Sequence, residues 1–351
     1  KKINWGIIGL GNIAHEFSKA FAETNNAKLL AISSKDENKL KKFRQQFNVE
    51  SKFSFQNYQD LINCEEVDIV YIALPNSFHK QWILKAIKNN KNILVEKPAT
   101  VNLSEAREIK KYLEKTNIFF SEAFMYRYHP QIQSVIDIIK DNKIGNLLSM
   151  KTSFGINILT KKKLFIFTKK KKINPKSRLF DKDLGGGCIL DLGCYLTSFS
   201  LLMGSLKNKL TSNNFEISNI LIEMGETGVD VNSSAEILFQ NGFRSKVHAS
   251  FKDDLGNKSK IYGEKGTIFL NNSWFGGDII VSSKDVPEQK LSFKKLLSLS
   301  SYLKNENINQ LLDVKKNIGN SEKMAKKLSK ISKIRSIKLK NRIKKIPQVF
   351  Y

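Results

Sequence analysis

The chain has 351 residues, and this length favours two domains rather than one. Hydrophobic residues make up 41% of the chain and aromatic residues 10%, which excludes a disordered protein and supports ordinary buried cores. The 59 Lys and Arg residues outnumber the 33 Asp and Glu residues, so the formal net charge is +26 at pH 7.

This basic excess is open to two interpretations. A positive surface could attract a nucleic acid or an anionic membrane. However, only seven of the 59 basic residues are Arg, the residue best suited to planar phosphate recognition, and Lys is common along the whole chain. We therefore interpret the charge as compositional drift and expect no nucleic-acid or membrane partner. A positive field would still favour an anionic ligand such as a phosphorylated cofactor.

The sequence shows no pattern of a membrane span, a signal peptide or a disulfide framework. Its apolar runs fall short of the roughly 20 residues that a span needs, and the first of them leads into a glycine turn. Cys64, Cys188 and Cys194 have neither disulfide nor metal-ligand spacing, and there are only four His residues. We expect no metal site, and a reducing cytoplasm is the simplest location.

The first 123 residues alternate short apolar runs with helical patterns. The expected strands are 3–8, 28–33, 68–73, 92–95 and 117–121, and the expected helices are 13–23, 35–47, 79–89 and 104–115. Such alternation favours an α/β fold, with βαβ units that form a doubly wound parallel sheet of the Rossmann type. Ser104 is expected to begin the last of these helices, because acidic residues follow it in the first turn.

From residue 124 to about residue 303 the pattern changes to longer alternating strands. The runs 234–239 and 243–251 flank Asn241-Gly242, which is a hairpin signal, and predict an α+β domain with a mostly antiparallel sheet. The lysine clusters 161–163 and 169–172 indicate an exposed hairpin or loop.

The last segment, 304–351, is polar and basic. Met324, Leu328 and Ile331 recur at helical spacing, which predicts an amphipathic helix with a lysine-rich outer face. Docking on the protein surface is one interpretation of this helix, and an arm that binds a membrane surface or a nucleic acid is the other.

A glycine turn follows the first expected strand and opens a helix. Gly9 permits the tight turn, Gly11 lets the backbone approach a pyrophosphate, and the small Ala14 lets helix and strand lie close together. Asn12 and Ile13 form the start of the helix, whose free N–H groups and dipole attract phosphate. The turn therefore predicts a dinucleotide site.

The end of the second strand indicates which dinucleotide binds. An NAD site usually has Asp or Glu at this position, whereas an NADP site needs a cation. The chain has Ser34, which can donate to a 2′-phosphate, and Lys35, which can neutralise it. Asp36 follows and could instead start the next helix. We expect NADP, with NAD as the alternative.

A lysine follows the fifth expected strand, in Glu96-Lys97-Pro98. Catalytic groups of open α/β sheets gather beyond the carboxyl ends of the strands, so Lys97 is expected where the nicotinamide would lie. Pro98 restricts the backbone that follows it.

Five motifs in order resemble the Gfo/Idh/MocA family over residues 3 to about 280. They are the first strand with its glycine turn, Leu74-Pro75-Asn76 with His79, Glu96-Lys97-Pro98, Glu122-Ala123 with Arg127-Tyr128-His129-Pro130, and Gly185 to Tyr195. The resemblance implies that the cofactor is bound by Leu74, Pro75, Asn76, His79, Glu96, Lys97 and Arg127, besides the residues named above. It also implies homodimers or homotetramers that form through the open face of the second sheet.

Tyr195 stands where many family members have His, which is similar to the branch with dihydrodiol dehydrogenase, xylose dehydrogenase and glucose–fructose oxidoreductase. The resemblance implies a catalytic pair of Lys97 and Tyr195. Met125 replaces a Trp that is frequent in this branch, so substrate specificity does not carry over.

The expected chemistry is hydride transfer between a nicotinamide and a sugar, cyclitol or related polyol or carbonyl compound. Tyr195 is expected to act as general acid/base, because an adjacent Lys97 ammonium stabilises the phenolate. Asp191 lies four residues earlier and could orient the substrate or Lys97 if the segment is helical, or could simply start the helix. Cys194 is expected to serve packing only.

Two other functions are compatible with the sequence. One is a trans-dihydrodiol dehydrogenase activity, which would use the same pair of residues. The other is a non-catalytic regulatory protein that binds NADP, because the first domain alone would bind the cofactor.

Overall fold

The computed structural model describes residues 2–163, 167–207, 215–284 and 287–292. These residues form two compact units, divided between Ala123 and Phe124, and each unit is described by itself. The expected basic helix around Met324 lies outside the described residues.

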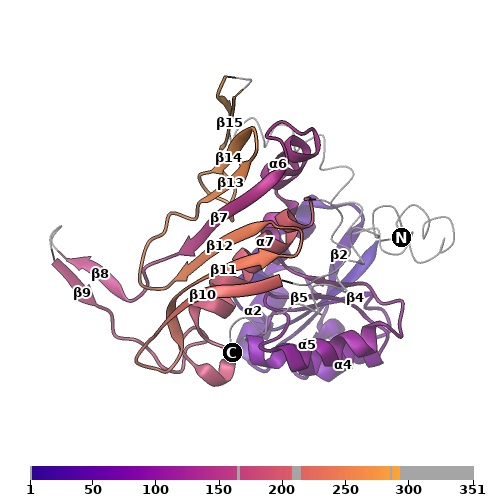
Figure 1. Cartoon of the computed structure of the whole chain (residues 1–351). Helices are drawn as coiled ribbons and strands as arrows, with labels where there is room; N and C mark the ends of the chain where they lie inside the picture. Colours follow the sequence, from indigo (N-terminus) through magenta and orange to yellow (C-terminus); the bar gives the residue numbers. More distant parts are fainter. Residues whose placement is uncertain (1, 164–166, 208–214, 285–286, 293–351) are drawn as a thin grey trace. The chain divides into compact units, whose positions relative to one another are not determined.

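The first unit contains a parallel sheet of six strands in the order β3-β2-β1-β4-β5-β6 (Figure 1). The strands are β1 (Ile3–Ile8), β2 (Ala27–Ser33), β3 (Ser54–Phe55), β4 (Ile69–Ile72), β5 (Asn92–Val95) and β6 (Phe120–Glu122). The central strands β4 and β5 are buried at every position, as expected of strands covered on both faces. The doubly wound Rossmann sheet is confirmed.

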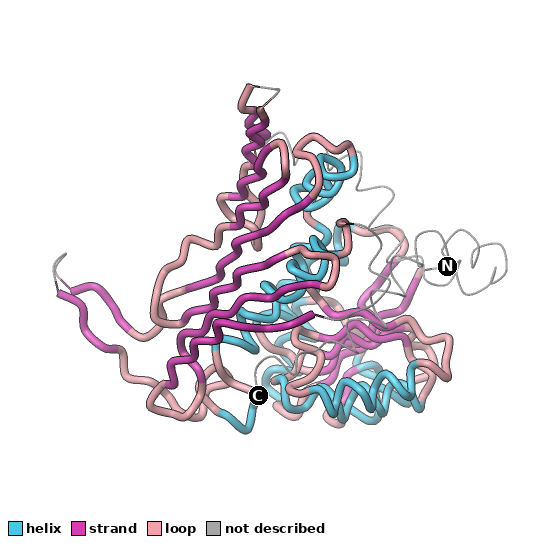
Figure 2. The backbone as a smooth tube through the Cα atoms, in the orientation of Figure 1, coloured by secondary structure: helices cyan, strands magenta, loops and turns pink. Residues whose placement is uncertain are grey.

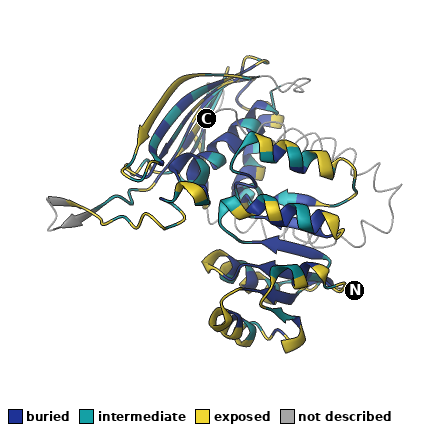
Figure 3. Ribbon diagram, turned by 90° about the horizontal axis from the view of Figure 1, so that it is seen from below, coloured by how far each residue is buried: buried dark blue, intermediate teal, exposed yellow. Residues whose placement is uncertain are grey.

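Five helices accompany this sheet. They are α1 (Asn12–Lys19), α2 (Glu37–Gln46), α3 (Tyr58–Asn63), α4 (Asn76–Lys88) and α5 (Leu103–Leu113). Figure 3 shows the exposed residues of these helices gathered on their outer sides, as the amphipathic patterns require. The expected helix 13–23 is α1 followed by a 3₁₀ turn at Ala20–Glu23, and α3 and β3 were not expected.

The start of α5 corrects one expectation. Asn102, and not Ser104, caps the helix, because its side-chain oxygen accepts a hydrogen bond from the backbone N–H of Glu105 at 2.9 Å. The Glu105 carboxylate in turn accepts from the N–H of Val101 at 3.2 Å. Two N–H groups at the helix start are thereby satisfied, in an arrangement close to a capping box.

The second unit is built on a sheet of eight strands in the order β10-β11-β12-β7-β13-β14-β15-β16 (Figure 1). Figure 2 draws these strands in magenta. Only β12 and β7 are parallel in it, which confirms the mostly antiparallel sheet. The strands are β7 (Leu147–Gly155), β10 (Phe215–Met224), β11 (Asp230–Phe239), β12 (Arg244–Ser250), β13 (Ser259–Gly263), β14 (Gly266–Leu270), β15 (Ile279–Ser283) and β16 (Gln289–Leu291). A separate hairpin of β8 (Thr160–Lys163) and β9 (Phe167–Lys170) stands where the two lysine clusters were noted.

One face of this sheet is covered by helix, and the described residues leave the other face open. Residues of β11 alternate between buried and partly exposed positions, as they do in a half-buried strand. The buried side chains pack with α6 (Pro130–Lys140) and α7 (Cys194–Gly204) in one core. The expected hairpin is present: β11 and β12 are joined through Gln240–Phe243, where Gly242 has a φ of 78°.

The segment that ends in α7 is longer and more apolar than any segment expected from the sequence. Lys182–Gly204 is long and apolar enough to cross a membrane by length and composition, but 72% of its apolar window is buried inside the protein. We interpret it as a core helix, because core helices of soluble proteins also have this composition.

Candidate active site

The expected dinucleotide residues of the first unit gather at one edge of its sheet. The N–H of Gly9, after β1, donates to the carbonyl of Ser33 at the end of β2 at 3.0 Å. The N–H of Ala73, after β4, donates to the carbonyl of Ile8 at 2.9 Å. Leu74, Pro75 and Asn76 continue from Ala73 into α4. The carboxyl ends of parallel strands therefore meet here, as in other open α/β sheets.

The glycine turn fits a bound pyrophosphate. Gly9 has a φ of +89°, and a Cβ there would lie 2.5 Å from the carbonyl oxygen of Ala73, so the fold itself requires this glycine. A Cβ on Gly11 would meet no described protein atom within 4 Å. Gly11 is the N-cap of α1 without a side-chain cap, and the N–H groups of a helix's first turn have no partner within the helix. The space fits the phosphate groups of a dinucleotide.

Asp36, after the end of β2, caps a helix and is not placed as the ribose-binding acidic residue of an NAD site is. Its carboxylate accepts from the N–H of Lys39 at 3.1 Å and caps α2. Ser34 accepts from the N–H of Asp36 at 3.2 Å and remains buried. The Lys35 ammonium lies 5.9 Å from the ring centroid of Tyr58. The loop thus presents a cation, while the nearest carboxylate is used by its own helix.

Lys97 follows β5 in a loop that is held from both sides. The Glu96 carboxylate accepts from the Tyr71 hydroxyl at 2.6 Å and from the N–H of Lys97 at 3.3 Å. The buried Glu122 carboxylate accepts from the N–H of Ala99 at 2.9 Å. The Lys97–Pro98 peptide bond is cis. The backbone around Lys97 is therefore fixed at the carboxyl edge of the sheet.

His79 is a buried bridge between two loops of this edge. Its Nδ1 lies 2.8 Å from the carbonyl oxygen of Pro98 and its Nε2 lies 2.7 Å from that of Leu74. The side chain is fully buried, and this burial lowers the pKa of His79, although both carbonyls favour the charged ring. Both ring nitrogens of His79 thus join the Leu74 and Pro98 loops, and the expected contact of His79 with the cofactor stays a prediction.

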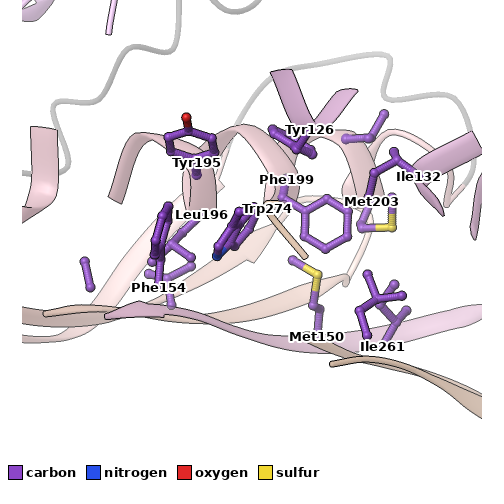
Figure 4. Close-up of a cluster of buried hydrophobic side chains, with 14 of the residues drawn as sticks. Tyr126, Ile132, Met150, Phe154, Tyr195, Leu196, Phe199, Met203, Ile261 and Trp274 are labelled. Atoms are coloured by element: carbon purple, nitrogen blue, oxygen red, sulfur yellow. The ribbon is translucent and has the colours of Figure 1, made fainter. Parts of the chain in front are cut away.

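Tyr195 lies in an aromatic cluster of the second unit. Its ring is edge-on to Phe124 at 5.4 Å and to Phe154 at 5.3 Å, and Trp274 lies at 5.7 Å between ring centroids. The side chain is only 6% exposed, and Figure 4 shows its hydroxyl pointing away from the sheet. The cluster therefore fixes the ring and leaves the phenol oxygen at the edge of the core.

Asp191 and Tyr195 lie on one face of a helical segment. The sequence predicted this arrangement only if the segment is helical. Ile189–Gly193 forms a π-helical turn that continues into α7, with the N–H of Cys194 bonded to the carbonyl of Ile189. A spacing of four residues returns a side chain to within about 40° in an α-helix, and a π turn gives a similar offset. π turns are frequent at functional sites.

Arg178 forms an ion pair with Asp191 that the sequence did not predict. Its Nη1 lies 3.0 Å from Oδ1 of Asp191. Arg178 is 13 residues from Asp191 and lies outside the motifs named above. The only feature of the sequence that sets it apart is that the chain has only seven arginines.

The glycines before Asp191 fit the loop that carries Arg178. The N–H of Gly187 donates to the carbonyl of Leu179 at 3.0 Å, and the N–H of Gly186 donates to that of Asp181 at 2.9 Å. A Cβ on Gly186 would lie 2.8 Å from both of these carbonyl oxygens. On Gly187, whose φ is +112°, it would lie 2.1 Å from Oδ1 of Asp230. Glycine is therefore required at both positions.

Arg127 is bound to α7 within the second unit. Its Nη2 donates to the carbonyl of Ser198 at 3.1 Å, and its Nε donates to the hydroxyl of Tyr126 at 3.2 Å. Tyr126 also exchanges a hydrogen bond with the hydroxyl of Ser198 at 2.7 Å. These bonds fasten the turn Met125–Tyr128 to the helix of Tyr195, while the expected contact of Arg127 with a cofactor stays a prediction.

Two cysteines lie near this helix start. Cys188 is buried and donates to Oδ2 of Asp230 at 2.9 Å, and burial raises the pKa of its thiol far above the usual range. Asp230 also accepts from the N–H of Ile189 at 2.7 Å. Cys194 donates to the carbonyl of Asp191 at 3.6 Å. These contacts fix the backbone on both sides of Asp191.

Comparison with known proteins decides the family. The oxidoreductase family with an NAD-binding Rossmann fold matches residues 3–124, and the GFO/IDH/MocA C-terminal domain matches residues 132–269. The chain belongs to the Gfo/Idh/MocA oxidoreductase family. It is thus an NAD(P)-binding oxidoreductase, and the resemblance seen in the motifs is confirmed.

Curated relatives include both dehydrogenases and reductases. Trans-1,2-dihydrobenzene-1,2-diol dehydrogenase of Xenopus tropicalis is 27% identical over 286 residues, which cover 80% of this chain and 79% of the relative. dTDP-3,4-didehydro-2,6-dideoxy-alpha-D-glucose 3-reductase of Saccharopolyspora spinosa is 24% identical over 278 residues, which cover 78% and 76%.

Solved structures share the fold. The aldose-aldose oxidoreductase of Caulobacter crescentus, complexed with glycerol, gives a TM-score of 0.70 at 20% identity and covers 83% of this chain and 84% of that one. A 3-ketoreductase of Actinomadura kijaniata in complex with NADP gives 0.65 at 21% identity, with 86% and 88% covered.

Proposed function

We propose that the protein transfers hydride between NADP and a hydroxylated substrate of the sugar, cyclitol or polyol type. The observation that carries this proposal is Tyr195, whose ring is fixed by the aromatic cluster while its hydroxyl points out of the core. Lys97, in a fixed loop at the carboxyl edge of the first sheet, would supply the cation that assists Tyr195. The bound nicotinamide would supply or accept the hydride.

In this proposal Tyr195 exchanges the proton of the reacting hydroxyl. A free tyrosine has a pKa of about 10 and is a poor base at neutral pH. A Lys97 ammonium beside the phenol would stabilise the phenolate and so make the exchange feasible near pH 7. In the reductive direction Tyr195 donates its proton to the carbonyl oxygen as hydride arrives, and in the oxidative direction it takes that proton back.

The proposed preference for NADP rests on the loop after β2. Lys35 provides a cation beside Ser34, and Asp36 is held at the start of α2 by its bond to Lys39. A 2′-phosphate would meet positive charge here and no competing carboxylate. Lys35→Ala should therefore weaken NADPH binding about tenfold and NADH binding far less. Equal losses for both cofactors would contradict this preference.

A substrate panel with one variant tests the reaction. The panel contains D-xylose, D-glucose, myo-inositol and trans-1,2-dihydrobenzene-1,2-diol, each with NADP and NAD. Tyr195→Phe should keep NADPH affinity and lose about 100-fold or more in kcat. Near-wild-type turnover in this variant, or no turnover of any panel compound by the wild type, would refute the proposal.

A trans-dihydrodiol dehydrogenase activity is the second candidate. It is favoured by the similarity to the Xenopus enzyme over 80% of the chain. The diol in the panel separates it from a sugar-directed activity, because the substrate with the highest kcat/KM decides between them. A non-catalytic NADP-binding regulator would bind the cofactor and turn over none of the four compounds.

We further propose that a second copy of the chain covers the open face of the eight-stranded sheet. This face carries a hollow of about 490 Å³, whose lining includes Leu221, Glu236, Lys246 and His248. Leu221 on the edge strand β10 is 70% exposed. Exposed apolar side chains on a broad sheet face are typical of contact surfaces.

A further inference from the structure

Arg178 forms an ion pair with Asp191, which lies four residues before Tyr195 at the start of the same helical segment. The Asp191 side chain is only 15% exposed, whereas that of Arg178 is 58% exposed. The cation therefore approaches Asp191 from the solvent side and leaves the carboxylate largely enclosed.

Arg178 is delivered by a loop with little freedom. Phe180, two residues later, is buried against Phe251 at 5.9 Å between ring centroids. The N–H groups of Phe180 and Asp181 both donate to the carbonyl of Ser177 at 2.9 Å. Together with the two bonds from Gly186 and Gly187, these contacts fix the backbone on both sides of Arg178. A fixed arginine loses less conformational entropy on pairing than a free surface side chain does.

The other end of the pair is fixed as well. The N–H of Asp191 donates to the carbonyl of Gly187 at 3.1 Å, and the π turn that carries Asp191 is anchored at Ile189 by Asp230. A guanidinium at 3.0 Å restricts the rotation of the carboxylate. The carboxylate is therefore held in one orientation on the helix face of Tyr195.

We propose, building on the proposed function, that Arg178 is a positioning residue that holds Asp191 as an oriented hydrogen-bond acceptor for the substrate. A charged carboxylate only accepts hydrogen bonds, so it selects a substrate that donates one. The substrate class that follows is an alcohol or carbonyl compound with a hydroxyl on the carbon next to the reacting one. A ketone without a neighbouring hydroxyl cannot donate this hydrogen bond and is bound less well.

Four variants test this role with the best substrate of the panel. Arg178→Ala and Asp191→Asn should each raise KM about tenfold, with kcat changed less than about threefold and NADPH affinity unchanged. Arg178→Lys should recover part of the loss, because it keeps a cation but not the planar geometry. Lys176→Ala is the matched control, since it removes one exposed positive charge from the same loop and should leave KM unchanged.

A double variant and a substrate without the neighbouring hydroxyl make the test specific for Arg178 acting through Asp191. The double variant Arg178→Ala/Asp191→Asn should be no worse than Asp191→Asn alone, because Arg178 acts through Asp191. With a counterpart lacking the neighbouring hydroxyl, such as 2-deoxy-D-glucose for D-glucose, wild type and Arg178→Ala should have KM values within about twofold of each other.

The outcomes separate this inference from the proposed function. If Tyr195→Phe abolishes turnover but Arg178→Ala has the KM of Lys176→Ala, the positioning role is wrong and the reaction stands. It is also wrong if Arg178→Ala raises KM equally for both members of the substrate pair. If the wild type turns over no panel compound, or Tyr195→Phe stays active, the proposed function fails and the role of Arg178 fails with it.

Discussion

The two glycines of the first turn carry different constraints. Gly9 adopts a left-handed φ of +89°, and a Cβ there would lie 2.5 Å from the carbonyl oxygen of Ala73. Gly11 has a φ of −87°, which any residue adopts, and open space lies before it. Gly9 is thus required by the fold, whereas we expect Gly11 to be required by the bound cofactor.

This difference predicts opposite phenotypes for two alanine variants. Gly11→Ala should change the free energy of unfolding by less than about 0.5 kcal/mol and weaken NADPH binding about tenfold or more. Gly9→Ala should cost about 1–3 kcal/mol of stability, because its backbone conformation and its contact are both strained. Urea unfolding and NADPH fluorescence titration measure the two effects. A stable Gly11→Ala protein that binds NADPH normally would contradict the assigned role of this residue.

His79 predicts a pH dependence of stability. Burial lowers its pKa in the folded protein, while the unfolded chain has a pKa near the ordinary value of about 6.5. Below about pH 6.5 the unfolded state therefore binds more protons than the folded state, and stability falls as the pH decreases. Each unit by which the pKa is lowered corresponds to about 1.4 kcal/mol.

The test compares the wild type with His79→Gln between pH 7.5 and pH 5 by urea unfolding, over a range set by the ordinary histidine pKa of about 6.5. The wild type should lose more stability across this range than the variant does. His129 and His248, whose pKa values burial also lowers, remain in both proteins and cancel in the comparison. Parallel pH profiles would show that His79 does not titrate differently on folding.

Among the elements, the start of α5 gives a matched pair of substitutions. Asn102 caps the helix, whereas Ser104 lies inside it as its second residue. Asn102→Ala should cost about 1 kcal/mol, and Ser104→Ala should have little effect because Ala is the better helix former. Thermal unfolding of the two variants provides the measurement. Equal midpoints would mean that the bond from Glu105 to Asn102 contributes nothing.

The elements also show what the sequence could reveal. The bounds of β1 and β5 followed from their apolar runs, since buried parallel strands leave a continuous signal. By contrast, β3 has two residues and α3 has six, too few to show a period. The cap at Asn102 was missed because Ser104 offers an equally valid local start, and only the hydrogen bond distinguishes the two.

The same limit applies to the candidate site. Gly9, Gly11 and Lys97 were proposed because each follows a strand, and Tyr195 because of the resemblance to the family. Arg178 was not, because an ion pair across 13 residues depends on how the intervening loop folds. The burial of His79 was equally invisible, since the carbonyl groups that surround it belong to two separate loops.

At the scale of the whole molecule, the open sheet face predicts the oligomeric state. If a second copy covers it, Leu221→Asp should shift the protein toward the monomer, because it places a charge on an apolar contact surface. Size-exclusion chromatography with light scattering at several concentrations measures this shift. Lys170→Asp on the β8–β9 hairpin is a control for the added charge. A monomeric wild type would contradict the proposal.

The π turn Ile189–Gly193 joins two anchored segments, with Cys188 and Ile189 held by Asp230 on one side and the ring of Tyr195 held by its aromatic cluster on the other. Apart from Asp191, the length of this turn therefore matters more than its composition. Even Gly193 has room for a Cβ, which would meet its nearest neighbour at 3.7 Å. Among related proteins, substitutions in this turn should therefore be far more frequent than deletions. The loss of one residue would rotate Tyr195 relative to Ile189 by about 100° about the helix axis.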